Sequence, residues 1–157
     1  PIQLTFARSI DPVITQEHSI TRVAVATEKE AENMKGENHT MGRKSTIHYG
    51  LYCCHGFVSA NLAKQTGFSE EDLNIFWEAL QNMFDQDHSA ARGLMSARKL
   101  ILFKHDSEIG CASASDLFDR VHISKVNQYS VARSFSDYIV TIDKQNLPQG
   151  VTIEDLI

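Results

Sequence analysis

The segment that most constrains the fold lies near the middle of the chain, at residues 69–84. Large apolar side chains recur there at helical spacing, with polar residues between them. These are Leu73, Phe76, Trp77, Leu80, Met83 and Phe84. Ser69 is a favourable N-cap, and Asp72 three positions later completes a weak capping box. The pattern predicts a helix over 69–84 whose apolar stripe packs on a sheet and holds that sheet together.

Apolar segments on both sides of this helix predict β-strands. Residues 46–62 form a long strand region that two glycines interrupt, and 99–104 is a continuous apolar run typical of a central strand buried on both faces. Residues 113–117 predict one helical turn. Further strands are expected at 2–7, 20–26, 121–126 and 138–142, and residues 151–157 are expected to form a terminal strand or a tail.

Residues 28–45 differ from the rest of the chain because they are polar, mixed in charge and nearly free of large apolar side chains. Met34 and Met41 are the exceptions, and two glycines lie between and beside them. Such a segment buries too little apolar surface to offset its ordering entropy. We therefore expect a long mobile loop, which inside a compact domain is either functional or disordered.

The totals limit the class of protein. The chain of 157 residues predicts one domain, and no apolar run approaches the length of a membrane span. Three cysteines, two of them adjacent, do not make a disulfide framework, so a reduced, cytoplasmic protein is expected. The chain begins directly on a strand pattern without an initiator Met, which favours a piece of a longer protein over a trimmed complete domain.

The distribution of charge is more informative than the net charge of −5, which alone argues against nucleic-acid binding. Residues 70–87 contain six acids and no Lys or Arg, and residues 88–105 contain four bases and no acid. The acids cover the solvent side of the predicted helix. The bases lie in the following loop and strand, so one edge of the fold is expected to be positive.

The histidine and cysteine patterns bear on metal binding and catalysis. The seven histidines occur in no HxxxH or HExxH spacing, and the three cysteines in no CxxC spacing. Cys53 and Cys54 are neighbours on a predicted strand, so they point to opposite faces and cannot jointly chelate a metal. No metal, no cofactor and no catalytic residue is predicted.

The remaining candidates are hydrogen-bond donors on strand ends and on the predicted loop. They are Arg8, His18, Arg22, Arg43, Lys44, Arg92 and Lys99. Each of them alone is typical of ordinary surface charge. Together with the glycines and the loop they suit a phosphate backbone, because Arg and Lys neutralise phosphates and glycine permits close approach.

Several segments, in order along essentially the whole chain, resemble the backbone subunit of a type I-C CRISPR surveillance complex (Cascade). They are residues 3–12 (QLTFARSIDP), 17–22 (EHSITR), 41–44 (MGRK), 49–52 (YGLY), 55–60 (HGFVSA) and 98–101 (RKLI). As a set they are specific, although any one of them alone is weak.

The resemblance implies a RAMP-superfamily subunit with a ferredoxin-like, RRM-type palm, of which this chain is similar to the C-terminal half. The expected fold is α+β: a partial palm with an antiparallel sheet, one main helix and a flexible thumb hairpin within residues 18–60. Implied partners are CRISPR RNA, target DNA through the guide, copies of the subunit itself and other Cascade subunits. The implied role is to polymerise along the guide RNA without catalysis, and the candidate cations above become RNA contacts.

Two alternatives remain open at this point. One is a metal-dependent ribonuclease of the same superfamily, with His18 or His48 as general base. The other is a protein-interaction module of the same complex that does not contact RNA.

Overall fold

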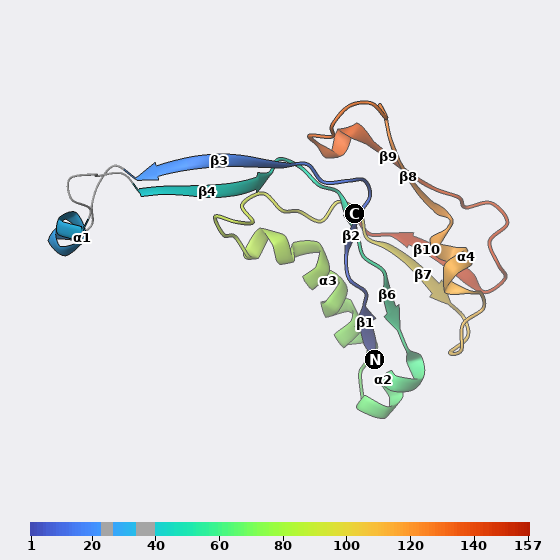
Figure 1. Cartoon of the computed structure of the whole chain (residues 1–157). Helices are drawn as coiled ribbons and strands as arrows, with labels where there is room; N and C mark the ends of the chain where they lie inside the picture. The colour runs from blue at the N-terminus through green and yellow to red at the C-terminus, as the bar shows by residue number, and fades with distance from the viewer. Residues whose placement is uncertain (23–26, 34–39) are drawn as a thin grey trace.

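The structure, a computed structural model, describes residues 1–22, 27–33 and 40–157 (Figure 1). Its described strands pair as five separate two-stranded antiparallel sheets, accompanied by one long helix and several short ones. The predicted α+β class with antiparallel pairing is confirmed. No helix in these ranges is both long and apolar enough to cross a membrane.

The long helix α3 (Glu70–Gln86) confirms the helix prediction. The Ser69 hydroxyl accepts from the backbone N–H of Asp72 at 3.1 Å, and the Asp72 carboxylate accepts from the Ser69 N–H at 2.9 Å, so both halves of the capping box form. The apolar stripe is only half-buried, and none of the helix residues is fully buried. The expected role as a clamp over a complete sheet is therefore only partly realised within this chain.

Two short ribbons lie near α3 (Figure 1). Strand β1 (Ile2–Leu4) pairs with β6 (Gly56–Val58), and β2 (Arg8–Ser9) pairs with β5 (Tyr52–Cys53). The predicted strand region 46–62 is wrong at its end, where helix α2 (Ala60–Thr66) begins. Ser59 caps that helix by accepting from the N–H of Leu62, a local signal that outweighs strand propensity.

The longest ribbon joins β3 (Thr15–Arg22) to β4 (Thr40–Ile47) and projects away from the other elements, with α1 (Glu28–Asn33) near its far end (Figure 1). The prediction of a loop over 28–45 is wrong at both ends of that range. Its first residues form α1 and its last residues belong to β4. Backbone pairing between two polar strands supplies the order that apolar burial does not. The expected strand 20–26 begins earlier, at Thr15. Residues 23–26 and 34–39 lie outside the described residues.

The C-terminal third contains two more ribbons. Strand β7 (Ile101–His105) pairs with β10 (Val151–Asp155), and β8 (Val121–Lys125) pairs with β9 (Tyr138–Ile142). The prediction of a central strand at 99–104 is wrong, since β7 has a partner along one edge among the described strands and is only partly buried. An apolar run indicates burial, but it does not determine how many strands surround it.

The small core of the described residues lies in this third. It consists of Leu117 from α4 (Ala114–Phe118), Ala132, Tyr138 and Val151. The short 3-10 helix η1 (Phe135–Asp137) leads directly into β9. The predicted helical turn at 113–117 and the strands near 121, 138 and 151 are confirmed.

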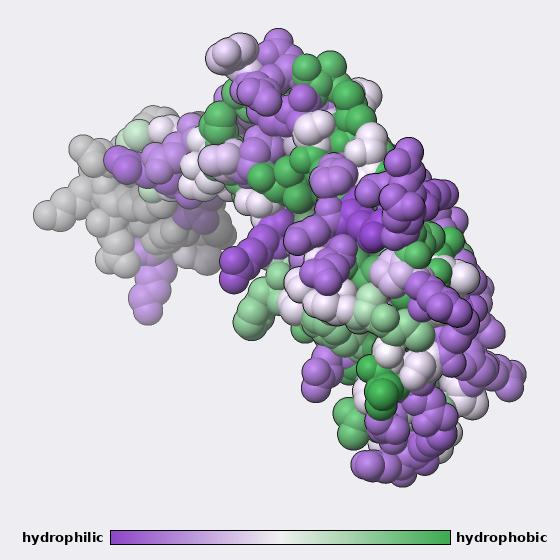
Figure 2. Space-filling view, turned by 90° about the vertical axis from the view of Figure 1, so that its right-hand side faces the viewer, coloured by the Kyte–Doolittle hydropathy of each residue, from purple (hydrophilic) through white to green (hydrophobic). Residues whose placement is uncertain are grey.

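The chain exposes far more surface than its size requires. Its accessible area is 12016 Å², whereas a compact monomer of 17.6 kDa exposes about 7900 Å². Phe6 is 94% exposed and Leu94 is fully exposed. Figure 2 shows apolar residues distributed over the surface among polar ones rather than enclosed. Much of the apolar surface is therefore left uncovered by the chain itself.

Candidate nucleic-acid interface

The β3–β4 ribbon presents two chemically different faces. In its register His18 lies opposite Lys44, and side chains alternate between the faces along each strand. One face, here called the basic face, carries Gln16, His18, Ile20, Arg22, Gly42, Lys44 and Thr46. Among the described residues of the ribbon, this face has no Asp or Glu. It presents hydrogen-bond donors and cations on a projecting element, with the pair Ile20–Gly42 between Lys44 and Arg22.

The opposite face carries the other predicted cation of the ribbon. Arg43 pairs with Ser19, and Glu17 pairs with Ser45, so Arg43 and Glu17 are diagonal neighbours on one face. Arg43 and Lys44 are consecutive and therefore point in opposite directions. The structure thus separates two residues that the sequence placed in one contact group.

The side chains of the basic face are open to solvent. Every residue of β3 is exposed, and so is Lys44. The Nε2 atom of His18 lies 2.9 Å from the hydroxyl of Thr46, which holds the imidazole along the face. Within the described parts of the chain, Lys44 has no carboxylate partner, so its ammonium group is available to an external anion.

The bases of residues 88–105, by contrast, have internal partners. Arg92 pairs with Asp87 at 2.7 Å, and Lys99 pairs with Asp155 at 2.7 Å. The other two bases are engaged as well: Lys104 lies 3.2 Å from Glu154, and the guanidinium of Arg98 lies 5.6 Å from the ring centre of Phe135. The expected positive edge is therefore wrong, because strand β10 brings Asp155 to Lys99 and Glu154 to Lys104, which are 56 and 50 positions apart in the sequence.

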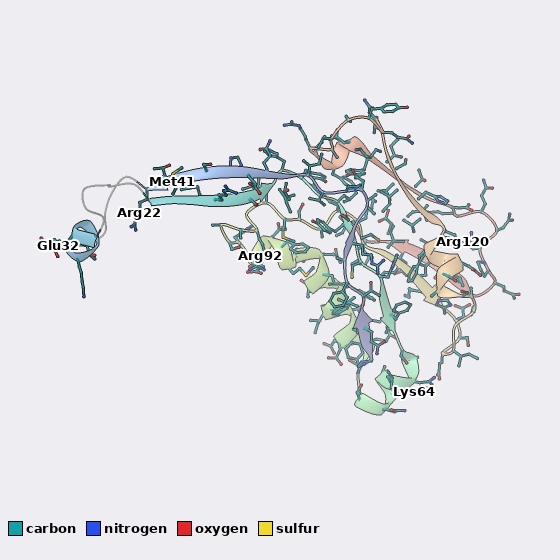
Figure 3. All side chains as sticks on the ribbon, in the orientation of Figure 1. Arg22, Glu32, Met41, Lys64, Arg92 and Arg120 are labelled. Carbon is teal, nitrogen blue, oxygen red and sulfur yellow. The ribbon has the colours of Figure 1, made fainter. Side chains whose placement is uncertain are left out.

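The predicted cations do not form a single patch. Figure 3 places Arg22 at the far end of the ribbon and Arg92 beside α3. Arg8 is exposed on β2, opposite Cys53, and therefore lies outside the β3–β4 ribbon. The structure brings together His18 and Lys44, with Arg22 further along the same face. RNA contact by Arg8, Arg92 and Lys99 stays a prediction. The carboxylates that pair with Arg92 and Lys99 would compete with an RNA phosphate for these two side chains.

A cavity of about 150 Å³ lies where the ribbon joins the rest of the fold. Its polar lining comes from three distant segments: Asp11, Gln16, His48, Tyr49, Arg133 and Tyr138. No local motif marks this set, so it was not predictable from the sequence. The pair Tyr49–Gly50, an aromatic residue beside a residue without a side chain, was its only signal.

A hydrogen-bond network fixes the floor of this cavity. The hydroxyl of Tyr138 donates to the carboxylate of Asp11, which also lies 3.4 Å from the ammonium of Lys125. The rings of Tyr49 and Tyr138 lie 6.3 Å apart. Burial raises the pKa of both phenols above the ordinary value of 10.0, which extends to higher pH the range in which they are neutral.

The histidines proposed as general bases have neutral partners. His18 contacts the Thr46 hydroxyl, and the Nε2 atom of His48 lies 2.5 Å from the Gln16 carbonyl oxygen. Among the described residues, no three His, Cys, Asp or Glu side chains are grouped so that they could hold a metal ion. All three cysteines are free, and burial raises the pKa of the Cys53 thiol, which favours the unreactive protonated form.

Comparison with known proteins supports one family. The family model for CRISPR-associated protein Cas7 matches residues 1–143, which is most of the chain. The chain therefore belongs to the Cas7 family. No curated protein matches it.

Proposed function

We propose that this Cas7 family chain is the RNA-binding part of a non-catalytic backbone subunit in a cytoplasmic type I-C CRISPR surveillance complex (Cascade). Copies of the subunit polymerise along the guide RNA and present it to target DNA. The observation that carries this proposal is the basic face of the β3–β4 ribbon. It offers His18, Arg22 and Lys44 on one exposed surface, and the residues of that surface that the structure describes include no Asp or Glu.

The chemistry of that face suits a phosphate backbone and not particular bases. A Lys ammonium or Arg guanidinium neutralises phosphates without reading sequence. Gly42, on the same face, has nothing within 4 Å of the position that a Cβ would take, so the ribbon surface is open beside Lys44. Sequence-blind contact is what a subunit needs if its guide can have any sequence.

The exposed surface supports assembly into something larger. The area of 12016 Å² exceeds the compact-monomer value by about 4100 Å², whereas a standard interface buries about 800 Å² on each partner. We propose that the chain is the C-terminal part of a palm, and that the rest of the subunit and neighbouring copies cover this surface. The thumb of this palm would be the ribbon.

The test is a salt titration of RNA affinity in the full-length subunit, with two single-stranded RNAs of unrelated sequence. Lys44→Ala is expected to weaken binding of both RNAs by similar factors and to flatten the log–log salt slope by about 0.7, the value for one single-strand phosphate contact. Arg43→Ala is the matched control, because it removes a neighbouring charge from the opposite face. Its slope is expected to change less.

Three results would contradict the proposal. Loss of affinity for one RNA only, with an unchanged slope, would mean that Lys44 reads bases. Equal effects of Lys44→Ala and Arg43→Ala would mean that RNA does not bind preferentially to the basic face. Cleavage of the RNA by the wild-type subunit, in the presence of a divalent metal and absent without it, would favour the ribonuclease alternative.

A further inference from the structure

The β3–β4 ribbon has little packing of its own to set its direction. It projects away from the other elements (Figure 1), and every residue of β3 is exposed. A two-stranded ribbon is marginally stable in water when it has no surface to pack on. The direction in which the basic face points is therefore determined where the ribbon leaves the rest of the fold, at residues 10–14 and 48–51.

These two segments, here called the roots of the ribbon, are tied to each other. The N–H of Ile10 donates to the carbonyl of Leu51 at 2.9 Å, and the Nε2 atom of His48 lies 2.5 Å from the side-chain oxygen of Gln16. Asp11 precedes a proline, which restricts its backbone to extended conformations. A contact that holds the Asp11 side chain therefore restricts the direction in which β3 leaves its root.

Two groups of the β8–β9 pair hold Asp11. The hydroxyl of Tyr138 donates to its carboxylate, and the ammonium of Lys125 lies 3.4 Å from it. Lys125 and Tyr138 lie opposite each other in the register of the two strands, so both side chains extend from the same face. Because Tyr138 belongs to the small core, the contact joins the root of β3 to the best-packed part of the chain.

Lys125 makes a second contact, to the loop 126–134 that follows β8. Its ammonium donates to the carbonyl of Ser130. Asn127 orders the same loop, because its side-chain oxygen accepts from the N–H of Tyr129 at 3.0 Å. Lys125 therefore links the root of the ribbon to a loop that has hydrogen bonds of its own.

The pair of Lys125 and Asp11 is better suited to positioning than to stability. The two side chains are 15% and 27% exposed, so both lose most of their hydration on folding. The cost of that desolvation offsets much of the attraction between the charges. What such a pair can contribute is the selection of one arrangement of the groups around it.

We propose that Lys125 is a positioning residue for RNA binding: through Asp11 it sets the direction of the β3–β4 ribbon, and through Ser130 it couples that direction to loop 126–134. The inference rests on the proposed RNA-binding function and adds to it a residue that does not itself contact RNA. The affinity for RNA falls in proportion to the fraction of molecules whose ribbon points along the RNA path.

The experiment measures ribbon direction and RNA affinity in the full-length subunit. Spin-labelled amino acids at Thr21 on β3 and Thr141 on β9 report the distance between the two elements by pulsed electron paramagnetic resonance, without RNA. The wild type should give a narrow distribution of distances, which Lys125→Met should broaden. The same variant should weaken binding of two unrelated single-stranded RNAs by about tenfold, the factor that corresponds to one charge-assisted hydrogen bond. The log–log salt slope should not change, because no phosphate contact is lost.

Two further variants separate positioning from charge. Lys64→Met is the matched control, because it removes the same charge from a lysine that also pairs with a distant acid but lies on α2, outside the roots. It should leave the distances and the affinity at the wild-type values. Asp11→Asn removes a negative charge, which by charge alone would favour RNA. It is nevertheless expected to broaden the distances and to weaken binding, as Lys125→Met does.

A double-mutant cycle and amide exchange test the two contacts of Lys125. The variant with both Asp11→Asn and Lys125→Met should bind RNA no more weakly than Lys125→Met alone, because both substitutions remove the same contact. Additive losses would show that Lys125 does not act through Asp11. Asp11→Asn should also speed hydrogen exchange at the amides of Tyr129 and Ser130, and unchanged exchange there would overturn the coupling to the loop.

The outcomes separate this inference from the proposed function. If Lys125→Met matches Lys64→Met in distances and affinity while the wild type binds RNA, the positioning role is wrong and RNA binding stands. A salt slope flattened by about 0.7 would also overturn it, since Lys125 would then contact a phosphate directly. If the wild type does not bind RNA, the proposed function fails, and so does a positioning role for RNA binding. The distances measured without RNA would then still show whether Lys125 sets the direction of the ribbon.

Discussion

Tyr138 and Asp11, which are 127 positions apart in the sequence, are joined by a hydrogen bond from the phenol to the carboxylate. The contact ties the segment before β3 to the start of β9. It therefore fixes the base of the projecting ribbon to the part of the chain that has a core.

Removing that hydrogen bond should loosen the base of the ribbon. Tyr138→Phe is expected to lower the free energy of unfolding by about 1.5–3 kcal/mol, the range for a hydrogen bond to a charged group. Burial, and then the bond to Asp11, raise the pKa of Tyr138. The neutral phenol is thus favoured by folding, and its contribution is intact below pH 10.0, the ordinary value, and is lost as the pH rises further.

The measurement is urea unfolding followed by circular dichroism between pH 8 and pH 11. The difference between wild type and Tyr138→Phe should shrink at the alkaline end. Tyr129→Phe, at a fully exposed position, serves as the control. A difference that stays constant with pH would show that the phenol of Tyr138 is not held neutral.

The capping box should make the stability of α3 sensitive to acid. Hydrogen bonds from the backbone and side chain of Ser69 lower the pKa of Asp72 below its ordinary value of 3.8. The carboxylate is therefore favoured by folding, and its contribution is present above that pH and is lost as the pH falls. Asp72→Asn should lower the melting temperature at pH 7 and approach the wild type near pH 3, whereas Glu78→Gln should show no such trend.

The half-buried state of α3 predicts a modest effect of truncating its largest side chain. Trp77→Ala is expected to lower the free energy of unfolding by about 1–2 kcal/mol, because the ring is only half-buried. Truncating a fully enclosed ring would lower it by roughly 3–5 kcal/mol. Chemical denaturation of the isolated chain measures this value. A loss of roughly 3–5 kcal/mol would contradict this prediction, because it would mean that the Trp77 ring is fully enclosed in solution.

Two glycines should respond oppositely to alanine. Gly150 has φ of +79°, and a Cβ there would lie 2.9 Å from the sulfur of Cys111. Gly150→Ala is therefore expected to destabilise by about 2–3 kcal/mol through backbone strain and a clash. A Cβ at Gly42 would meet open space, so Gly42→Ala should change the free energy of unfolding by no more than about 0.5 kcal/mol. Thermal unfolding compares the two, and equal shifts would contradict the prediction.

Local signals predicted the local structure well. The helix α3 was predictable because its cap and stripe lie within a few residues of one another. The ribbon was harder, since β4 is polar and carries a glycine, and its order comes from pairing with β3 and not from burial. The separation of Arg43 from Lys44 follows from strand alternation once the strand is known.

Features that depend on distant segments were not predictable from the sequence. The charge on Lys99 is offset by Asp155, and only the β7–β10 pairing brings that carboxylate near. The cavity combines residues near positions 11, 48 and 133, which nothing in the sequence relates. The number of strands around β7 is likewise a property of the assembled sheet.

The large accessible surface of the folded chain affects how it should respond to denaturant. The dependence of unfolding free energy on urea concentration scales with the area newly exposed, and much of that area is already in contact with solvent. The chain alone should therefore unfold over a broad range of urea concentration. Five ribbons that share few buried side chains would also lose amide protection separately, so hydrogen exchange would report several opening events instead of one.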